Sequence, residues 1–284
     1  REVGIHPDIL VCRSKAHITD EMREKLSLFC DVDTEAVIEA MDADTIYDVP
    51  LGFEASGMAE LISKRLYLYE SKATTRDFQD WQRVVNAVTR PTQATEVALV
   101  GKYTENPDAY LSVVEALHHG GIENNARVNI RWIESKDLDE QPVEEILKGV
   151  AGIVVPGGFG ERGVEGKLSA VRYARENGIP FFGLCYGLQM AVIEYARTMC
   201  GMEGANTTEV DEQSPYPVIH ILPEQVEVQD KGATMRLGVY PCRLEEGTLA
   251  RKLYGETLIY ERHRHRYEVN NAYRDEMAAK GLVF

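Results

Sequence analysis

Short apolar blocks alternate with stretches of helical periodicity along most of the chain. From residue 95 onward the blocks predict strands at 97–101, 128–133, 152–155 and 179–182. Between and after them, apolar residues return every three or four positions, as on one face of a helix. This β-α-β-α order predicts an α/β fold with a mainly parallel sheet flanked by helices. The predicted helices are 108–118, 142–147, 167–177 and 189–197.

The first part of the chain shows a second α/β pattern that ends before this sheet begins. Strands are predicted at 7–13, 36–38 and 45–50, and helices at 20–30, capped by Thr19, and at 59–65. A polar stretch follows, with one helix at 77–88 that Pro91 ends. We therefore expect three parts: residues 1–69 as the tail of one domain, 70–93 as a linker and 94–284 as a second domain.

A cysteine between two glycines lies where the strand at 179–182 meets the helix at 189–197. The turn is Gly-Leu-Cys-Tyr-Gly at 183–187. It is the thiol counterpart of the nucleophile elbow, whose strained backbone leaves no room for neighbouring Cβ atoms. The helix N-terminus behind the sulfur favours the thiolate. Cys185 is predicted to attack a carbonyl carbon; a buried structural cysteine is the alternative.

A glycine-rich turn follows the preceding strand. Three of the four residues 157–160 are glycine, and they come after the strand at 152–155. Carboxyl ends of parallel strands meet at one edge of a sheet, so we expect this turn beside Cys185. Its N–H groups, with that of Tyr186, would stabilise an oxyanion. The alternative is a simple turn.

A cysteine nucleophile needs a base, usually histidine, and none of the seven histidines lies in an obvious catalytic setting. One segment near the C-terminus is strongly basic. In an extended strand its arginines would share one face and its histidines the other, which suggests binding of a carboxylate or phosphate, or else a charged edge strand. The arginines are Arg262, Arg264 and Arg266, and the histidines are His263 and His265.

Composition narrows the classes of function. With 46 acidic and 31 basic residues, the formal net charge of −15 disfavours a nucleic-acid partner. No apolar run is long enough to span a membrane, and no signal-peptide pattern begins the chain. The five cysteines are scattered and lack C-x-x-C spacing, which argues against disulfides or zinc and favours a cytoplasmic location.

Several longer strings form a recognisable set. They include Val-Pro-Gly-Gly-Phe-Gly at 155–160, Asn-Thr-Thr-Glu at 206–209 and the basic segment 261–271. With the elbow, they resemble CTP synthase, which has a class I (triad) glutamine amidotransferase domain. The resemblance covers essentially the whole chain. It implies a flavodoxin-like fold for the second domain and the tail of a P-loop-type α/β synthetase domain for the first.

The resemblance implies a two-part enzyme. In that family a synthetase domain uses ATP, with Mg²⁺, to phosphorylate O4 of UTP. A glutaminase domain hydrolyses glutamine, and the ammonia travels through the interior to the activated pyrimidine, which becomes CTP. GTP activates the enzyme, CTP inhibits it, and the active form is a homotetramer.

Motif by motif, the resemblance also implies residue roles. Cys185 would form the glutamyl thioester, and Glu209 would hold the α-amino group of glutamine. Lys25 matches a lysine that binds UTP and CTP, and Met41, Asp42 and Ala43 fall where the family contacts ATP. The other positions matched to the glutamine pocket are Gly158, Tyr186, Gly187, Leu188, Gln189 and Arg266, with Tyr186 in place of the usual leucine.

Two departures from the family lead us to expect an internal fragment. The family's catalytic histidine and glutamate lie in a Phe-His-Pro-Glu string, expected beyond Phe284. The P-loop and the Mg²⁺ ligands are expected before Arg1. The fragment by itself is then not expected to be fully active. The segment between Leu222 and Gly232 also looks shorter than the family's lid over the glutaminase site.

Two other functions stay open on the sequence alone. A stand-alone thiol hydrolase, such as a γ-glutamyl peptidase, would use the same Cys185 without nucleotides. Such a hydrolase would not need the residues before Lys25, which argues against this alternative. A non-catalytic assembly module would keep Cys185 as a vestige, against which the intact glycine pair and Glu209 argue.

Overall fold

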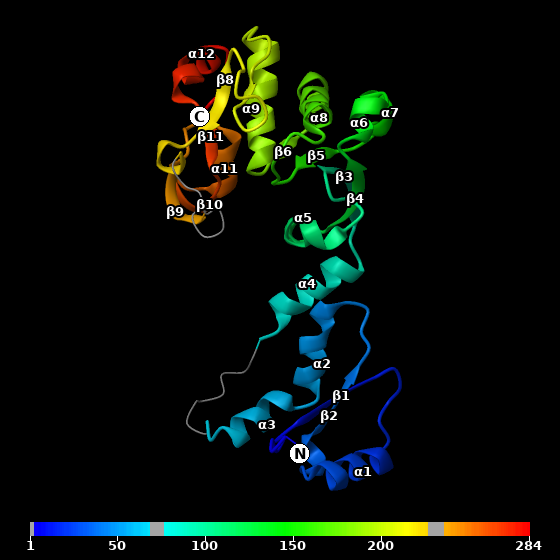
Figure 1. Ribbon diagram of the computed structural model, residues 1–284. Coiled ribbons are helices and arrows are strands. Elements are labelled where there is room, and N and C mark those ends of the chain that lie inside the picture. Colours follow the sequence, from blue (N-terminus) through cyan, green and yellow to red (C-terminus); the bar gives the residue numbers. More distant parts are fainter. Residues whose placement is uncertain (1–2, 69–76, 227–235) are drawn as a thin grey trace. The chain divides into compact units, whose positions relative to one another are not determined.

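The computed structural model describes residues 3–68, 77–226 and 236–284 (Figure 1). The chain divides into two compact units, residues 1–94 with 117–127 and residues 95–116 with 128–284. Two expectations fall outside the described residues: the domain boundary at Tyr69, and the part of the short lid segment beyond residue 226.

The first unit holds a two-stranded parallel sheet. Strand β1 (Leu10–Ser14) pairs with β2 (Val37–Met41) along its whole length. Helix α1 (Asp20–Cys30) joins the two strands, and the Thr19 side chain caps it by accepting from the Met22 N–H, as the sequence predicts. The other elements of the first unit are η1 (Thr34–Ala36), η2 (Ile46–Asp48), α2 (Val49–Ala55), α3 (Met58–Arg65) and α4 (Gln79–Thr89).

The strand predicted at 45–50 is wrong. These residues form the 3₁₀ turn η2 and the start of α2. The Thr45 hydroxyl accepts from the Tyr47 N–H, which begins a turn. Pro50 then lies in the first turn of α2, where its missing N–H leaves no hydrogen bond unmade. Local capping therefore overrides the β-branched composition of the segment.

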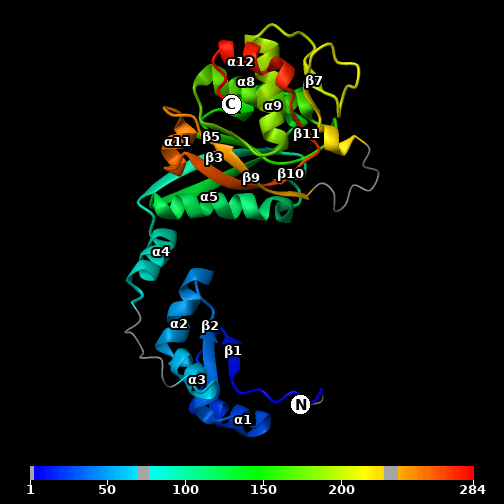
Figure 2. The same cartoon turned by 90° about the vertical axis from the view of Figure 1, so that its left-hand side faces the viewer.

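The second unit is built on the predicted sheet, in the strand order β4-β3-β5-β6. Its strands are β3 (Gln93–Gly101), β4 (Ala126–Glu134), β5 (Gly152–Val155) and β6 (Phe181–Gly183). The pairs β3–β5 and β5–β6 are parallel. Helices α8 (Val164–Asn177) and α9 (Tyr186–Met199) cover one face (Figure 2). On the other face lies the part of α5 (Leu111–Glu123) that belongs to this unit, residues 111–116 (Figure 2).

Both covering helices begin about one turn before the predicted positions, because their first turns start directly from the two glycine-rich loops. Helix α8 follows Gly163, and α9 follows Cys185. Of the residues that the structure describes, none belong to a helix that is both long and apolar enough to cross a bilayer. The remaining short helices are η3 (Pro107–Tyr110), α6 (Asp137–Glu140), α7 (Val143–Ile146), η4 (Pro223–Gln225), α11 (Leu249–Tyr254), η5 (Asn271–Tyr273) and α12 (Arg274–Ala279).

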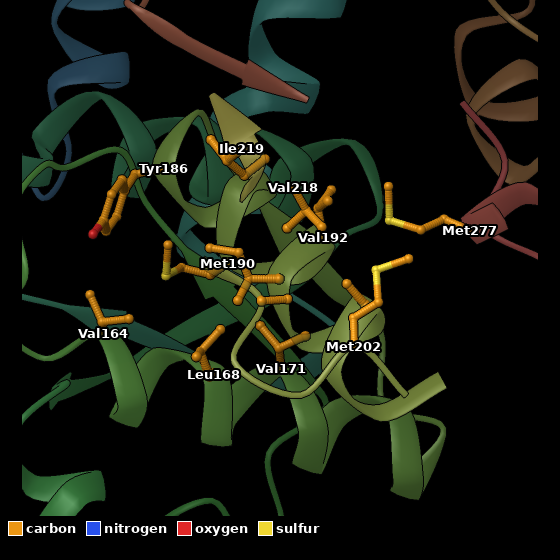
Figure 3. Close-up of a cluster of buried hydrophobic side chains, with 13 residues drawn as sticks. Val164, Leu168, Val171, Tyr186, Met190, Val192, Met202, Val218, Ile219 and Met277 are labelled. Atoms are coloured by element: carbon orange, nitrogen blue, oxygen red, sulfur yellow. The ribbon is translucent and has the colours of Figure 1, made fainter. Parts of the chain in front are cut away.

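A buried apolar cluster fixes α9 against its neighbours (Figure 3). Met190 and Ile193 on α9 are fully buried, and Leu168 on α8 packs into the same cluster. Burying side chains of this size stabilises the fold by roughly 1.5–3 kcal/mol each. The start of α9, where Cys185 lies, is therefore held on a rigid element.

The basic segment does not form one extended strand, so that prediction is wrong. Strand β10 (Leu258–Arg264) pairs with β9 (Arg236–Arg243), and the register shifts between His263 and Arg264. Strand β11 (Tyr267–Val269) then joins a different sheet, with β8 (Pro217–Ile221) and β7 (Asn206–Thr207). The break between the sheets ends the alternation of arginine and histidine faces.

Candidate active site

Cys185 occupies a strained turn between β6 and α9. Its φ of 50° and ψ of −99° place a non-glycine residue in a sparsely populated region. A Cβ atom on Gly187 would lie 2.0 Å from the Val155 carbonyl oxygen, and one on Gly183 would lie 2.5 Å from the backbone of Gly187. Backbone contact thus requires both glycines, and the turn has the geometry predicted for a nucleophile elbow.

The surroundings of the sulfur determine its protonation. Desolvation raises the pKa of the Cys185 thiol, the N–H of Tyr186 lowers it, and the Glu209 carboxylate raises it again. The helix N-terminus therefore favours the thiolate through the Tyr186 N–H, as expected, but desolvation and Glu209 outweigh it and the net shift of the pKa is upward. Sγ lies 3.9 Å from the Arg264 carbonyl oxygen, to which the thiol donates. Attack by this sulfur needs a base that removes its proton.

The glycine turn after β5 lies directly against the elbow, as predicted. A Cβ on Gly157 would lie 3.7 Å from Cys185 Cβ, and one on Gly158 would lie 3.7 Å from the Tyr186 ring. The Gly160 N–H, in contrast, donates to Glu209 Oε1 at 2.9 Å. Gly160 is therefore not an oxyanion donor in this arrangement, which leaves the first part of the turn and the Tyr186 N–H near the sulfur.

Glu209 brings a carboxylate to the same place from the loop after β7. Glu209 also acts through its charge. Desolvation is the main cause that raises the pKa values of Cys185, Tyr186 and Tyr267, and the Glu209 carboxylate raises each of them further. One carboxylate therefore influences Cys185 and Tyr186 at the start of α9 and Tyr267 on β11. A carboxylate beside a nucleophile can hold a substrate ammonium group.

The other residues matched to the glutamine pocket lie on α9 and beside it. Gln189 is buried, and its side-chain NH₂ donates to the Tyr267 carbonyl oxygen at 3.2 Å. Arg266 donates through Nη2 to the Gln225 carbonyl oxygen at 2.9 Å. Leu188 is exposed, and Gly187 forms part of the elbow itself. The structure brings Gln189 to the start of β11, next in sequence to Arg266.

The matched nucleotide residues all lie in the first unit. Lys25 is exposed on α1 and pairs with Glu21 at 2.7 Å. Asp42 accepts from Arg13 Nε at 2.9 Å. Met41 ends β2, and exposed Ala43 follows Asp42. Lys25 thus lies on α1, while Met41, Asp42 and Ala43 are consecutive at and just after the end of β2.

The two histidines of the basic segment bind each other. His265 Nε2 lies 3.1 Å from His263 Nδ1, and the His263 ring stacks on Tyr240. Burial lowers the pKa of His265. Within the described parts of the chain, Cys185 Sγ has its side-chain hydrogen bond with the Arg264 backbone and with neither imidazole. Neither His263 nor His265 is therefore hydrogen-bonded to Cys185 as a base would be.

Sequence reasoning missed Lys167, which is only 3% exposed. Its ammonium donates to Ser135 Oγ at 3.1 Å and to the carbonyl oxygens of Arg162 and Gly163 at 3.3 and 3.0 Å. A signal was present, because Lys167 shares a helical face with buried Ala170 and Ala174 at spacings of three and seven residues. A charged residue on a buried helical face calls for partners.

Among the described residues, no group of three or more His, Cys, Asp or Glu side chains is arranged to hold a metal ion.

Comparisons with known proteins agree with this geometry. Residues 106–284 match the family model for class-I glutamine amidotransferases, and residues 1–68 match the model for the CTP synthase N-terminus. The CTP synthase of Desulfitobacterium hafniense is 55% identical over 284 residues, covering 100% of this chain and 53% of the relative. That of Methanocaldococcus jannaschii is 54% identical over 289 residues, with the same coverage.

A solved structure extends the likeness to three dimensions. The glutaminase domain of Trypanosoma brucei CTPS, with bound acivicin, is 39% identical to this chain and superimposes with a TM-score of 0.61. The match covers 66% of this chain and 73% of that one. The α/β fold with a mainly parallel sheet is confirmed.

The elbow, the adjoining glycine turn and the fold place the chain among the class-I glutamine amidotransferases. Within that class it belongs to the CTP synthase family. The chain spans about half the length of the curated relatives it matches.

Proposed function

We propose that the second unit hydrolyses glutamine through a thioester on Cys185, and that the ammonia converts UTP to CTP in the polypeptide to which these residues belong. The observation that carries this proposal is the strained Cys185 turn packed against the glycine turn and Glu209. The matches of both parts of the chain to CTP synthases support it. They do not favour a stand-alone hydrolase, which would lack residues 1–68.

The chemistry assigned to the elbow is acyl transfer. A base takes the proton of Cys185, and Sγ attacks the side-chain amide carbon of glutamine. The N–H groups of Tyr186 and Gly158 stabilise the oxyanion that forms. The C–N bond then breaks, and ammonia leaves with the proton held by the base. Water attacks the thioester, releases glutamate and restores the thiol. We assign the base to the histidine of the family's Phe-His-Pro-Glu string.

Glutamine is held by groups whose chemistry matches its two charges. Glu209 takes the α-amino group, because a carboxylate pairs well with an ammonium ion. Arg266 lines the pocket and suits the α-carboxylate. Gly158 and the turn of Tyr186, Gly187, Leu188 and Gln189 surround the amide. In this assignment, the hydrogen bond from the Gly160 N–H orients the Glu209 carboxylate toward the substrate.

The nucleotide half of the proposal rests on the first unit. We assign residues 1–69 to the synthetase domain, 70–93 to the linker and 94–284 to the glutaminase domain. Lys25 is assigned to UTP and CTP, and Met41, Asp42 and Ala43 to ATP, which Mg²⁺ accompanies. GTP as activator, CTP as inhibitor, a homotetramer and a cytoplasmic location complete the proposal. Nucleic acids and membranes have no part in it.

Covalent labelling tests the proposed nucleophile. The whole natural polypeptide containing these residues is incubated with a glutamine-derived electrophile, and the modified peptide is identified by mass spectrometry. We expect one label, on Cys185, and protection by glutamine. The exposed-helix variant Arg172→Met serves as a control that should label like the wild type. A label on another cysteine, or one that glutamine does not compete with, would exclude Cys185 as the nucleophile.

A further inference from the structure

Lys167 is an unusual residue because it places an ammonium group in a buried setting next to the elbow. It lies on the first turn of α8 and is 3% exposed. Its three acceptors come from two elements: Ser135 follows β4, and the carbonyl groups of Arg162 and Gly163 end the glycine loop (residues 156–163). A buried charge is retained only where its hydrogen bonds are satisfied. Lys167 therefore ties the end of the glycine loop to the sheet.

The packing around these acceptors leaves little freedom. A Cβ on Gly163 would lie 2.2 Å from Ser135 Oγ, and one on Gly166 would lie 1.8 Å from the Ser135 carbonyl oxygen. The first turn of α8 thus rests directly on Ser135. The side chain of Arg162 also donates to Glu134 Oε1 at 2.9 Å, so the same end of the loop has a second tie to β4.

Tyr186 holds the middle of the same loop. Its hydroxyl donates to the Gly160 carbonyl oxygen at 2.5 Å, and its ring stands 5.9 Å from Lys167 Nζ. Burial is the main cause that raises the pKa of the Tyr186 phenol, and the Glu209 charge adds to it. The hydroxyl therefore keeps its proton and remains a donor at neutral pH. Gly158 packs on that ring. The Lys167 ammonium therefore lies near the Tyr186 ring, and both side chains donate hydrogen bonds to the loop.

We propose that Lys167 is a positioning residue for glutamine hydrolysis, holding with the Tyr186 hydroxyl the glycine loop in the shape that keeps Gly158 beside Cys185. This inference rests on the proposed function of the site. Lys167 does not touch the reacting atoms. It acts through the loop, whose backbone must be in place before charge develops on the substrate.

The charges that face the ammonium allow a pH test. The pKa of Lys167 is lowered to about 8, mainly by burial. The nearby cations Lys102 and Arg162 lower it further, and the carboxylates of Glu134 and Asp139 oppose this shift. Deprotonation relieves the cost of burying the charge, but it also removes one of the three N–H donors, so Lys167 itself holds the loop less firmly above that pH.

The test compares Lys167→Met and Tyr186→Phe with the wild type in the whole natural polypeptide. Each substitution keeps the volume of the side chain and removes hydrogen bonds. With glutamine as nitrogen donor, we expect kcat to fall by about tenfold for Lys167→Met and about fivefold for Tyr186→Phe, with KM changed by less than about twofold. CTP formation from added ammonia should stay at the wild-type rate. The ratio of wild-type to Lys167→Met activity should decline above about pH 8.

Arg172→Met is the matched control, since it removes a cation from an exposed position of the same helix. It should leave every rate unchanged. The inference is overturned if both Lys167→Met and Tyr186→Phe keep the wild-type kcat with glutamine. It is also overturned if the rates with glutamine and with ammonia fall equally, because such a loss indicates general misfolding. If Cys185→Ser still uses glutamine, the proposed function itself fails; if Cys185→Ser is inactive and the other two variants are normal, only this inference fails.

Discussion

At the scale of single residues, backbone contact decides which positions of the elbow can change. The positive φ of Cys185 costs of order 1–3 kcal/mol, which the surrounding structure must hold. A Cβ atom at Gly187 would lie 2.0 Å from the Val155 carbonyl oxygen, closer than any real Cβ atom approaches another non-bonded atom. The same contact fixes the start of α9, so the strain and the position of the nucleophile have one cause.

Substitution of Gly187 should therefore be severe. We expect Gly187→Ala to lower the free energy of unfolding by about 3 kcal/mol, because overpacking here moves backbone against backbone. The control is Gly120→Ala, in the helix α5, where the new methyl group meets nothing within 4 Å. That change should stabilise by about 0.5–1 kcal/mol. Urea unfolding of each variant, followed by overall fluorescence, measures both; similar effects at the two glycines would contradict the geometry.

Lys167 gives a second prediction at this scale, on the pH dependence of stability. Its pKa in the folded protein, about 8, lies below its ordinary value of 10.5. The unfolded chain holds the proton more tightly, so this residue's contribution to stability increases as the pH rises from 8 toward 10.5 and is lost as it falls. The difference amounts to about 3 kcal/mol. Urea unfolding at several pH values should show this rise in the wild type relative to Lys167→Met; parallel pH curves would contradict the burial of its charge.

At the scale of elements, an ion pair joins the two helices that begin at the glycine loop and at the elbow. Arg175 on α8 donates through Nε and Nη2 to both carboxylate oxygens of Glu194 on α9, at 3.1 and 2.8 Å. The Glu194 side chain is 4% exposed. A bidentate pair with this burial sets the relative positions of the helices as well as stabilising them.

Breaking the pair on one side should cost more than removing it entirely. Arg175→Met leaves a buried carboxylate without its main partner and should destabilise the fold by about 3 kcal/mol. The double variant Arg175→Met, Glu194→Met removes both charges and should recover at least half of that loss. Thermal unfolding of the two variants provides the comparison. A double variant no more stable than Arg175→Met would mean that the carboxylate left behind in the single variant carries no penalty.

The elements also show how far sequence patterns lead. Periodicity predicted the order of strands and helices, and the paired glycines located the strained turn and its neighbouring loop. The patterns failed where a local contact decides the outcome. Thr45 caps a turn in a segment of strand-like composition, and a sheet boundary divides the basic segment. The Glu209–Gly160 bond and the buried Lys167 depend on contacts distant in sequence, which no single segment records.

At the scale of the whole molecule, the chain unites parts that match two family models, and the proposed function links them through ammonia. The second unit brings Cys185, a glycine loop and the Glu209 carboxylate together in one place. The first unit carries Lys25 on α1 and residues 41–43 at the end of β2, to which the proposal assigns the nucleotides. The proposal therefore requires that glutamine hydrolysis and amination of UTP depend on different residues of one polypeptide.

The most direct test of this requirement is the nitrogen source used by the Cys185→Ser variant of the whole natural polypeptide. CTP formation from UTP and ATP is measured with glutamine and, separately, with added ammonia. We expect the glutamine-dependent rate to fall by at least about a thousandfold, since the nucleophile is lost, while the ammonia-dependent rate stays within twofold of wild type. Retention of glutamine-dependent synthesis would contradict the assignment of Cys185, and loss of both rates would contradict the division of labour between the two parts.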